Sequence, residues 1–307
     1  MDSKFPLDES ILALCPAGSV VLSAVAHGHS LWTITGKINK RHPDGDVRTC
    51  FIKAKKLANN DYGRTMLLSE FAALETLHCL APGSVSRPLP WGKYISALPD
   101  TYFLVEDFCE IDTALPSPSE LTRRVLRIHR VSSPCGLFGF PVTTFCGIVP
   151  HLNSWESSWS TFFAQHLRET VGMDRRTNGD WPELTLAAER LLTIVLPRLL
   201  DPLQQGNQPI VPRLIHGDLW NGNVGRGTET GQLVFVDVGS LYTHNELEIG
   251  SFRRYGKQNF GQSYAEDYKK VFPPSCPPDE FDDSYRLCSL KYDLGHSAGN
   301  PGNDSRK

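Results

Sequence analysis

The feature that most constrains this chain is a polar run, HGDLWNGN, that begins at residue 216 and lies between apolar segments. Asp218 is followed five residues later by Asn223, and a further fourteen residues on, an apolar strand-like run ends at Asp237, two residues before a glycine. Asp and Asn also stabilise ordinary turns. The order of these three residues, with this spacing, is harder to obtain by chance than any one short motif. We therefore expect the three side chains to face one common site.

This pattern is typical of phosphotransferases, in which a catalytic loop HxDxxxxN is followed by a metal-binding Asp before Gly. The reaction needs a carboxylate that orients the attacking hydroxyl and accepts its proton, and Asp218 fits that role. Mg²⁺ prefers carboxylate and amide oxygens, so Asn223 and Asp237 are the candidate metal ligands. The motif thus predicts ATP and Mg²⁺ as cofactors.

A kinase of this type needs a cation that binds the phosphates, and the upstream half offers one. Lys53 lies near the end of a strand-like segment, and Glu70 lies on the following amphipathic helix. A strand Lys paired with a helix Glu would hold the α- and β-phosphates. Lys55 and Lys56 are rivals for the same role.

A loop that covers the phosphates is expected between the first two strands. The segment AHGHS at 26–30 contains one glycine, where protein kinases show GxGxxG. Its position makes Gly28 and Ser30 candidate phosphate contacts through their backbone N–H groups.

The pattern along the chain favours an α+β fold with a small β-rich N-terminal lobe, residues 1–107, and a larger, mostly helical lobe, residues 108–307. The first lobe is expected to contain strands at 19–26, 31–38, 47–54, 91–94 and 101–105 and one main helix at 64–80. The second is expected to contain helices at 121–130 and 155–171, a helix from about 180 with a buried face at Leu184, Ala188, Leu191 and Val195, and a strand at 233–236. In residues 135–150 the apolar side chains recur with no clear period.

Composition narrows the function classes. Lys plus Arg number 31 and Asp plus Glu number 34, a net charge of −3, which argues against nucleic acid or an anionic membrane as partner. No apolar run reaches the roughly 18 residues of a transmembrane helix, and the first residues lack the pattern of a secretory signal. Eight cysteines are spread along the chain without a CxxC pair, which predicts reduced, mostly buried thiols in a cytoplasmic protein and no zinc site.

The chain resembles the fructosamine 3-kinase (ketosamine 3-kinase) family, especially its fungal-type members, within the protein-kinase-like, aminoglycoside phosphotransferase-like superfamily. The segments that carry this resemblance run from about residue 20 to 295: AHGHSLWT, FIKAK, LLSEFAALETL, GLFGFPVTTFCG, NSWESSWSTFFAQHLR, LIHGDLWNGNVG and FVDVGSLYTHNELEIG. The resemblance implies a two-lobed protein-kinase-like fold. It also implies ATP-dependent phosphorylation of the sugar 3-hydroxyl of a ketosamine, a fructosamine or ribulosamine adduct on a protein or a small ketosamine, as a deglycation step.

The resemblance also assigns roles by position. Asp218 would be the base, Asn223 and Asp237 the magnesium ligands, and Lys53 with Glu70 the phosphate-binding pair. Glu106 and Phe108 would belong to the hinge beside adenine. Trp220 would form an apolar platform for the sugar or pack in the core. His244 and Glu246 would shape the substrate side or serve as structural hydrogen-bonding groups.

Two other functions stay open. The first is a small-molecule phosphotransferase of the aminoglycoside or choline kinase type, since the shared motifs do not define the acceptor. The second is a catalytically impaired nucleotide-binding protein. The family normally continues beyond LKYDLGHSAGNPG into a further helix, whereas this sequence ends at NDSRK, residues 303–307, and we expect a less stable helical lobe.

Overall fold

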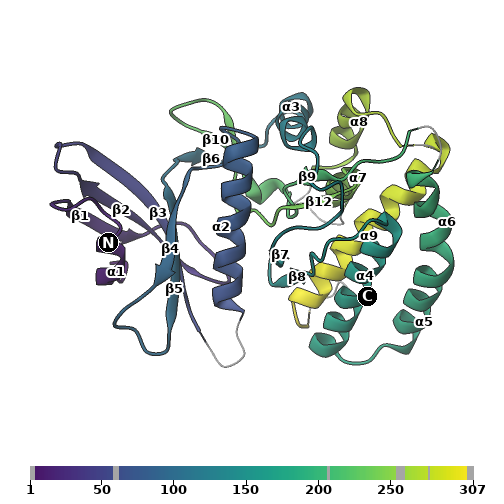
Figure 1. The fold of residues 1–307 in the computed structure, drawn as a ribbon, viewed down its shortest axis with the longest axis horizontal. Helices are drawn as coiled ribbons and strands as arrows, with labels where there is room; N and C mark the ends of the chain where they lie inside the picture. The colour runs from purple at the N-terminus through teal and green to yellow at the C-terminus, as the bar shows by residue number, and fades with distance from the viewer. Residues whose placement is uncertain (1–3, 58–61, 206–207, 254–259, 276, 303–307) are drawn as a thin grey trace.

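The computed structural model describes residues 4–57, 62–205, 208–253, 260–275 and 277–302. It consists of a β-sheet lobe followed by a helical lobe (Figure 1), which confirms the predicted α+β class. The boundary at 107/108 stays a prediction, although the last long strand of the sheet ends at Asp107. The C-terminal residues 303–307, on which we based the expected loss of stability, lie outside the described part.

The first lobe is built on a five-stranded antiparallel sheet with the order β1-β2-β3-β5-β4. Its strands are β1 (Val20–Ala26), β2 (Ile34–Arg41), β3 (Val47–Lys56), β4 (Pro88–Lys93) and β5 (Thr101–Asp107). One face packs on the N-terminal segment with α1 (Glu9–Leu12). Gly36 allows this, because a Cβ there would lie 2.4 Å from the buried ring of Phe5.

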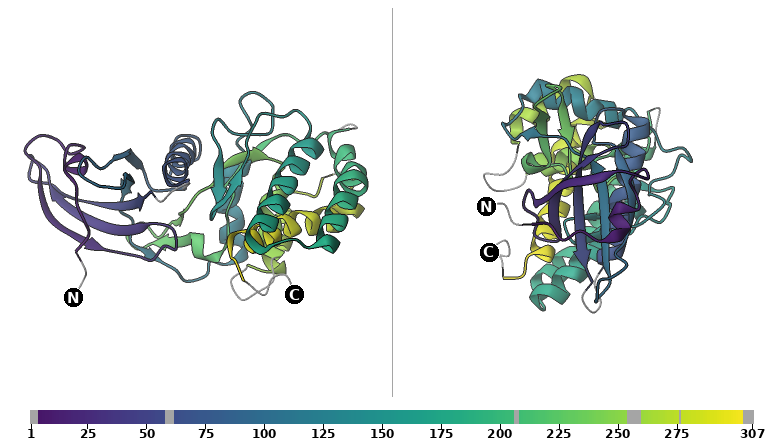
Figure 2. Two further views of the ribbon diagram at one scale, coloured as in Figure 1. Left: turned by 90° about the horizontal axis from the view of Figure 1, so that it is seen from below. Right: turned by 90° about the vertical axis from the view of Figure 1, so that its left-hand side faces the viewer.

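Helix α2 (Gly63–Leu80) lies between the sheet and the second lobe (Figures 1 and 2). Its buried residues Leu67, Leu74 and Leu77 belong to the same apolar cluster as the core of the helical lobe. This one continuous core ties the main helix of the first lobe to the second lobe.

The second lobe combines helices with short strand pairs. The helices are α3 (Pro118–His129), α4 (Trp159–Asn178), α5 (Pro182–Arg190), α6 (Leu196–Leu200), α7 (Glu246–Gly250), α8 (Gln262–Val271) and α9 (Phe281–Gly299). The strands are β6 (Ile111–Asp112), β10 (Val224–Gly227) and β11 (Leu233–Phe235) in one sheet, β9 (Arg213–Ile215) with β12 (Leu241–Thr243), and β7 (Thr144–Cys146) with β8 (Val149–His151). Short π or 3₁₀ turns occupy Leu191–Val195, Asp201–Gln204, Asn221–Asn223, Ser251–Arg253 and Pro278–Glu280.

Several predicted elements need correction. The strand expected at 31–38 begins only at Ile34, because the Ser30 hydroxyl accepts the Trp32 and Thr33 N–H groups and holds a turn. The helix expected at 155–171 begins at Trp159, where the Ser158 side chain caps it.

The buried face predicted from residue 184 to 195 is also wrong in part. Ala188 is buried, whereas Leu184, Leu191 and Val195 are only half-buried. Residues 135–150, for which no period was visible, contain the hairpin β7–β8, whose three-residue strands are too short to show one.

The seven cysteines that lie in the described residues form no disulfide bond; their reduced state stays a prediction. The expectation that most are buried is wrong, since only Cys50 and Cys288 among them are buried; Cys276 lies outside the described part.

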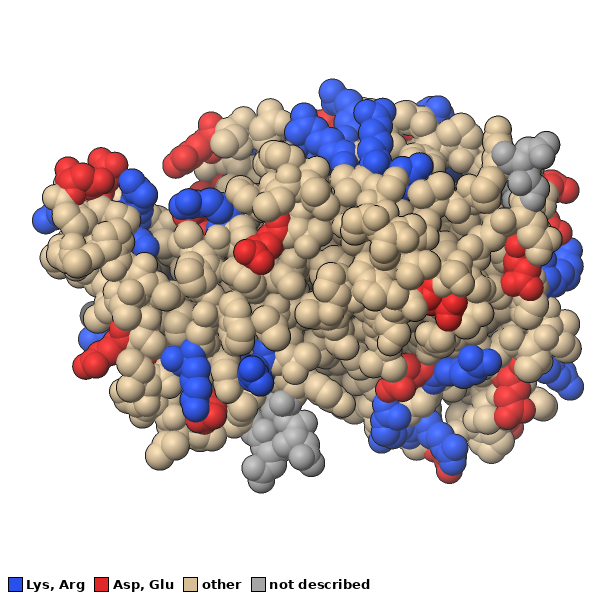
Figure 3. All heavy atoms as spheres, in the orientation of Figure 1, with Lys and Arg blue, Asp and Glu red and all other residues tan. Residues whose placement is uncertain are grey.

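On the face shown in Figure 3, acidic and basic side chains are interspersed, and one group of basic side chains gathers over the region of α3. No helix in the described residues is both long and apolar enough to cross a bilayer.

We predict that Leu74→Ala lowers the free energy of unfolding by about 2–5 kcal/mol, because Leu74 is 1% exposed and its truncation leaves a cavity in the core shared by both lobes. Leu80→Ala, on the same helix but 48% exposed, should cost less than about 1 kcal/mol. Urea denaturation of the two variants beside the wild type measures both values. Equal losses would contradict the shared core.

Candidate active site

Three charged side chains from three separate elements meet at Lys53. Lys53 extends from β3, and its ammonium lies 2.5 Å from a carboxylate oxygen of Glu70 on α2. The same ammonium donates to Asp237, which follows β11 in the second lobe. Lys53 and Glu70 are 8% and 17% exposed, whereas Asp237 is 55% exposed, so its carboxylate is open to an incoming ligand. The structure thus selects Lys53 over its neighbours Lys55 and Lys56 as the partner of Glu70.

The charges in this group are set by their contacts. Burial alone would lower the pKa of Lys53, but the Asp237 and Glu70 carboxylates outweigh it, so the pKa is raised and the ammonium stays charged. The Lys53 charge lowers the pKa of Asp237 and keeps it ionised. Burial raises the pKa of Glu70 despite the contact with Lys53. The carboxyl group of Asp237 is therefore more readily ionised than that of Glu70.

The two candidate metal ligands are neighbours. The Val236 N–H donates to the Asn223 carbonyl over 3.1 Å, which places Asn223 beside the residue that precedes Asp237. Asp237 has a φ of 55°, a left-handed conformation that Asp tolerates better than most residues. The Asn223 side-chain nitrogen donates to the Asp218 carbonyl over 2.9 Å, so its amide oxygen is the atom that can ligate a cation.

This donor set fits Mg²⁺ in a phosphate complex. In the described residues no three His, Cys, Asp or Glu side chains gather as a metal site. Mg²⁺ in kinases is held by one or two side chains together with substrate phosphates and waters. One carboxylate from Asp237 and one amide from Asn223 match that requirement.

Asp218 contacts a hairpin that the motif analysis left without a structure. The Cys146 thiol donates to one carboxylate oxygen of Asp218 over 3.0 Å. The Gly147 N–H donates to the other oxygen over 3.3 Å. Both residues lie at the tip of hairpin β7–β8, so this hairpin is part of the candidate site.

Close backbone packing holds the loop of Asp218 against the loop of Asp237. A Cβ on Gly217 would lie 2.2 Å from the Gly239 carbonyl oxygen, and one on Gly239 would lie 2.0 Å from that of Phe145. The Gly239 N–H also donates to the His216 carbonyl over 3.0 Å. Only glycine fits at these two positions, since a side chain would separate the layers.

A buried carboxylate that sequence analysis missed supports the same loop. Glu248 on α7 accepts the backbone N–H groups of His216 and Gly217, the two residues before Asp218. Burial would raise the pKa of Glu248, but His129 and His216 outweigh that effect and the pKa is lowered. The sequence did contain a signal for this residue. In the run ELEIG, at 246–250, two acidic residues alternate with apolar ones, and both Glu246 and Glu248 are buried.

The loop that we expect to cover the phosphates contains one glycine, and its turn is stabilised by the hydroxyl of Ser30. Gly28 has a φ of 76°, the left-handed conformation that a tight turn requires. The Ser30 hydroxyl accepts from the Trp32 and Thr33 N–H groups, both over 3.2 Å. The proposed contacts of Gly28 and Ser30 with phosphate stay predictions.

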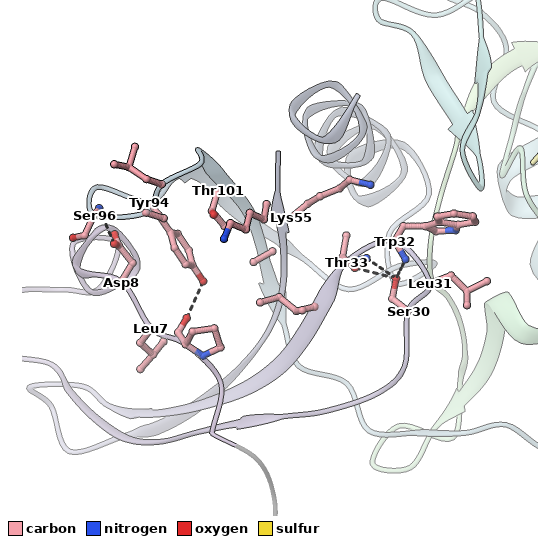
Figure 4. Close-up of a pocket in the computed structure, with 16 residues that line it drawn as sticks. Leu7, Asp8, Ser30, Leu31, Trp32, Thr33, Lys55, Tyr94, Ser96 and Thr101 are labelled. Atoms are coloured by element: carbon pink, nitrogen blue, oxygen red, sulfur yellow. Dashed lines mark hydrogen bonds between the residues drawn. The ribbon is translucent and has the colours of Figure 1, made fainter. Parts of the chain in front are cut away.

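A cavity of about 880 Å³ lies beside this loop and is lined in part by Ser30, Trp32 and Lys55 (Figure 4). The cavity thus adjoins the candidate phosphate contact Ser30, but its lining includes neither Lys53 nor Asp218.

The proposed hinge residues differ in what they offer to a nucleotide. Burial raises the pKa of Glu106 to about 8. The charge of Lys53 acts to lower this pKa, and the carboxylates of Glu70 and Asp237 act to raise it. The Phe108 N–H donates to the Thr49 carbonyl over 3.1 Å, and the Lys37 ammonium lies 3.9 Å from the centre of the Phe108 ring. Phe108 therefore has its N–H engaged within the protein, and its role beside adenine stays a prediction.

The remaining candidates are Trp220, His244 and Glu246. Trp220 is half-buried and its ring covers Gly222, where a Cβ would lie 2.3 Å from it; both roles considered for Trp220 stay open. His244 and Glu246 form a buried pair, 3.1 Å apart, and Glu246 also accepts the Ser275 N–H. These contacts agree with the structural role considered for them.

Comparison with known proteins identifies the class. The chain belongs to the fructosamine kinase family, whose model matches residues 26–300. It is 33% identical over 160 residues to the ketosamine-3-kinase of Mus musculus and 28% identical over 230 residues to a chloroplastic protein-ribulosamine 3-kinase of Oryza sativa subsp. indica. These matches cover 52% and 74% of this chain but only 47% and 62% of the two relatives.

The fold is shared with solved structures. A protein described as a fructosamine-3-kinase from Haemophilus somnus 129PT superimposes with a TM-score of 0.68 at 18% identity, over 91% of this chain and 85% of the other. A thermostable mutant of the aminoglycoside phosphotransferase APH(4)-Ia, in a ternary complex with AMP-PNP and hygromycin B, gives a TM-score of 0.55 at 13% identity, over 94% of this chain and 88% of the other. Together they confirm the predicted protein-kinase-like, aminoglycoside phosphotransferase-like fold.

We predict that Glu248→Ala lowers the free energy of unfolding by about 2–4 kcal/mol, since two buried N–H groups before Asp218 lose their acceptor. Because the folded pKa of Glu248 is lowered, its contribution is complete above its unfolded pKa of about 4.3 and is lost as the pH falls through the folded value. Urea denaturation at pH 7 and at pH 3 should therefore show a larger difference between wild type and variant at pH 7 than at pH 3. Glu183→Ala, an exposed position on α5, is the control, and an equal effect at both pH values would contradict the prediction.

Proposed function

We propose that this protein is an ATP-dependent kinase that phosphorylates the 3-hydroxyl of ketosamines, ribulosamine or fructosamine, on glycated proteins or small amines. Membership of the fructosamine kinase family supports the acceptor class. The observation that carries the proposal is the ammonium of Lys53, which contacts Glu70 and Asp237 at once. That arrangement places the phosphate-binding cation beside a candidate metal ligand.

In this proposal Lys53 binds the α- and β-phosphates of ATP, and Glu70 keeps its ammonium in place. Asn223 and Asp237 would hold Mg²⁺ through an amide and a carboxylate oxygen. When bound, Mg²⁺ neutralises charge on the β- and γ-phosphates. Release of Lys53 from Asp237 toward the phosphates would free that carboxylate for the cation.

Asp218 then serves the acceptor. Its carboxylate accepts a hydrogen bond from the sugar 3-hydroxyl, orients the oxygen toward the γ-phosphate and takes up the proton as the new P–O bond forms. The bond between the γ-phosphorus and the β–γ bridging oxygen breaks in the same transfer, and ADP leaves. Glu248 acts indirectly, because it holds the backbone that carries Asp218. Trp220, two residues on, is the side chain that we propose for the sugar ring.

The alternatives have less support. Likeness to an aminoglycoside phosphotransferase at 13% identity concerns the fold alone. A catalytically impaired nucleotide-binding protein would need Lys53, Glu70 and Asp237 to hold the nucleotide, but it would have no use for the carboxylate of Asp218 as a general base. We also propose a cytoplasmic location for this protein, on the basis of its sequence alone.

The experiment that tests the function is ATP consumption with Mg²⁺ and a panel of acceptors at equal concentration: a fructosamine, a ribulosamine, an aminoglycoside and choline. We expect turnover with the ketosamines. Asp218→Asn should lower it about 10²–10⁴-fold, the usual loss when a general base is removed. Asp283→Asn, on the exposed side of α9, is the control. Wild-type turnover by Asp218→Asn, or turnover of the aminoglycoside alone, would refute the proposal.

We further predict that Lys53→Met raises the KM for ATP by about tenfold or more, since a buried ammonium that would bind the phosphates is lost. Lys56→Met, at the exposed end of the same strand, should leave the KM within about twofold. Steady-state kinetics with varied ATP measures both. An effect at Lys56 in place of Lys53 would show that the wrong lysine was assigned.

A further inference from the structure

The tip of hairpin β7–β8 holds both oxygens of the Asp218 carboxylate. Cys146 donates its thiol proton to Oδ1 over 3.0 Å, and Gly147 donates its N–H to Oδ2 over 3.3 Å. These donors lie more than 70 residues before Asp218 in the chain and come from an element outside the kinase motif. An ionised carboxylate has about four acceptor positions, so these two donors do not by themselves fill it.

The hairpin is itself held firmly from two sides. On one side the Phe145 carbonyl lies directly against Gly239, where no side chain fits. On the other side His151, the last residue of β8, lies 2.7 Å from the ammonium of Lys291 on α9, and both residues are buried. The tip that contacts Asp218 is thus fixed relative to the Asp237 loop and to the helical core.

The tip nevertheless remains accessible. Cys146 is half-buried, Gly147 is exposed, and a Cβ on Gly147 would meet nothing within 4 Å. A change at Cys146 should therefore affect Asp218 more than the stability of the core.

From these contacts we propose that Cys146 is a positioning residue: its thiol, with the Gly147 N–H, sets the orientation of the Asp218 carboxylate toward the acceptor. The inference rests on the proposed function, in which Asp218 is the base. A carboxylate held at both oxygens keeps one orientation, whereas one held at a single oxygen can rotate away from the acceptor hydroxyl. Misorientation slows the chemical step without weakening ATP binding.

The kinetic test compares Cys146→Ala with Cys146→Ser. We expect Cys146→Ala to lower kcat about 3- to 10-fold, the loss for one hydrogen bond, with the KM for ATP unchanged. Cys146→Ser keeps a donor of similar size and should restore kcat to within about twofold of the wild type. Cys79→Ala, at an exposed position on α2, is the matched control and should have no effect. Wild-type kcat in Cys146→Ala, or an equal loss in both Cys146 variants, would overturn the inference.

A second measurement does not depend on turnover. A neighbouring carboxylate favours the protonated thiol, and the thiolate is the form that iodoacetamide alkylates. The alkylation rate of Cys146, read by peptide mass spectrometry, should rise about 3- to 10-fold in Asp218→Asn, while Cys79 and Cys135 react as in the wild type. An unchanged rate at Cys146 would overturn the contact.

The two measurements also separate this inference from the proposed function. If the wild type turns over no ketosamine but the alkylation rate rises, the proposed function fails and the contact stands. If the wild type is active and both Cys146 results are negative, the function stands and the positioning role fails.

Discussion

The arrangement of the candidate site depends on one ammonium group shared by two carboxylates. Lys53 takes its place from the register of β3 in the sheet, Glu70 from α2 and Asp237 from the turn after β11. A buried cation is costly unless it is paired, so the Lys53 position is stable only while these partners face it. The contact therefore joins the two lobes electrostatically at the same place where the apolar core joins them through α2.

Much of this site could be predicted from the sequence because its chemistry is local in the chain. Asp218 and Asn223 lie on one loop, and an apolar strand-like run leads to Asp237, so spacing alone indicated a common site. The Lys53–Glu70 pair followed from the strand-then-helix order, although only the structure separated Lys53 from Lys55 and Lys56. The α+β class followed from the change in periodicity along the chain.

The contacts that could not be predicted join residues that lie far apart in the sequence. Nothing near Cys146 in the sequence indicates that its thiol meets Asp218, and strands of three residues are too short to show alternation. The N–H groups of His216 and Gly217 find their acceptor in Glu248, 32 and 31 residues further along the chain. Local hydrogen bonds of side chains also moved the starts of two elements. Because of Ser30, β2 begins later than predicted, and because of Ser158, α4 does too. The overestimated burial after residue 180 arose because an apolar period does not show whether a helix lies at the periphery.

The Ser30 turn has a consequence for how a nucleotide would be received. The N–H groups of Trp32 and Thr33 already have an oxygen acceptor, the hydroxyl of Ser30. A phosphate oxygen that took these donors would replace a neutral acceptor with a charged one, and no previously unbonded donor would become satisfied. The enthalpy gained when phosphate binds at this loop would then be the difference between the enthalpies of the new and the replaced hydrogen bonds. In return, the loop holds its shape in the absence of a ligand, so less conformational entropy remains to be lost when one arrives.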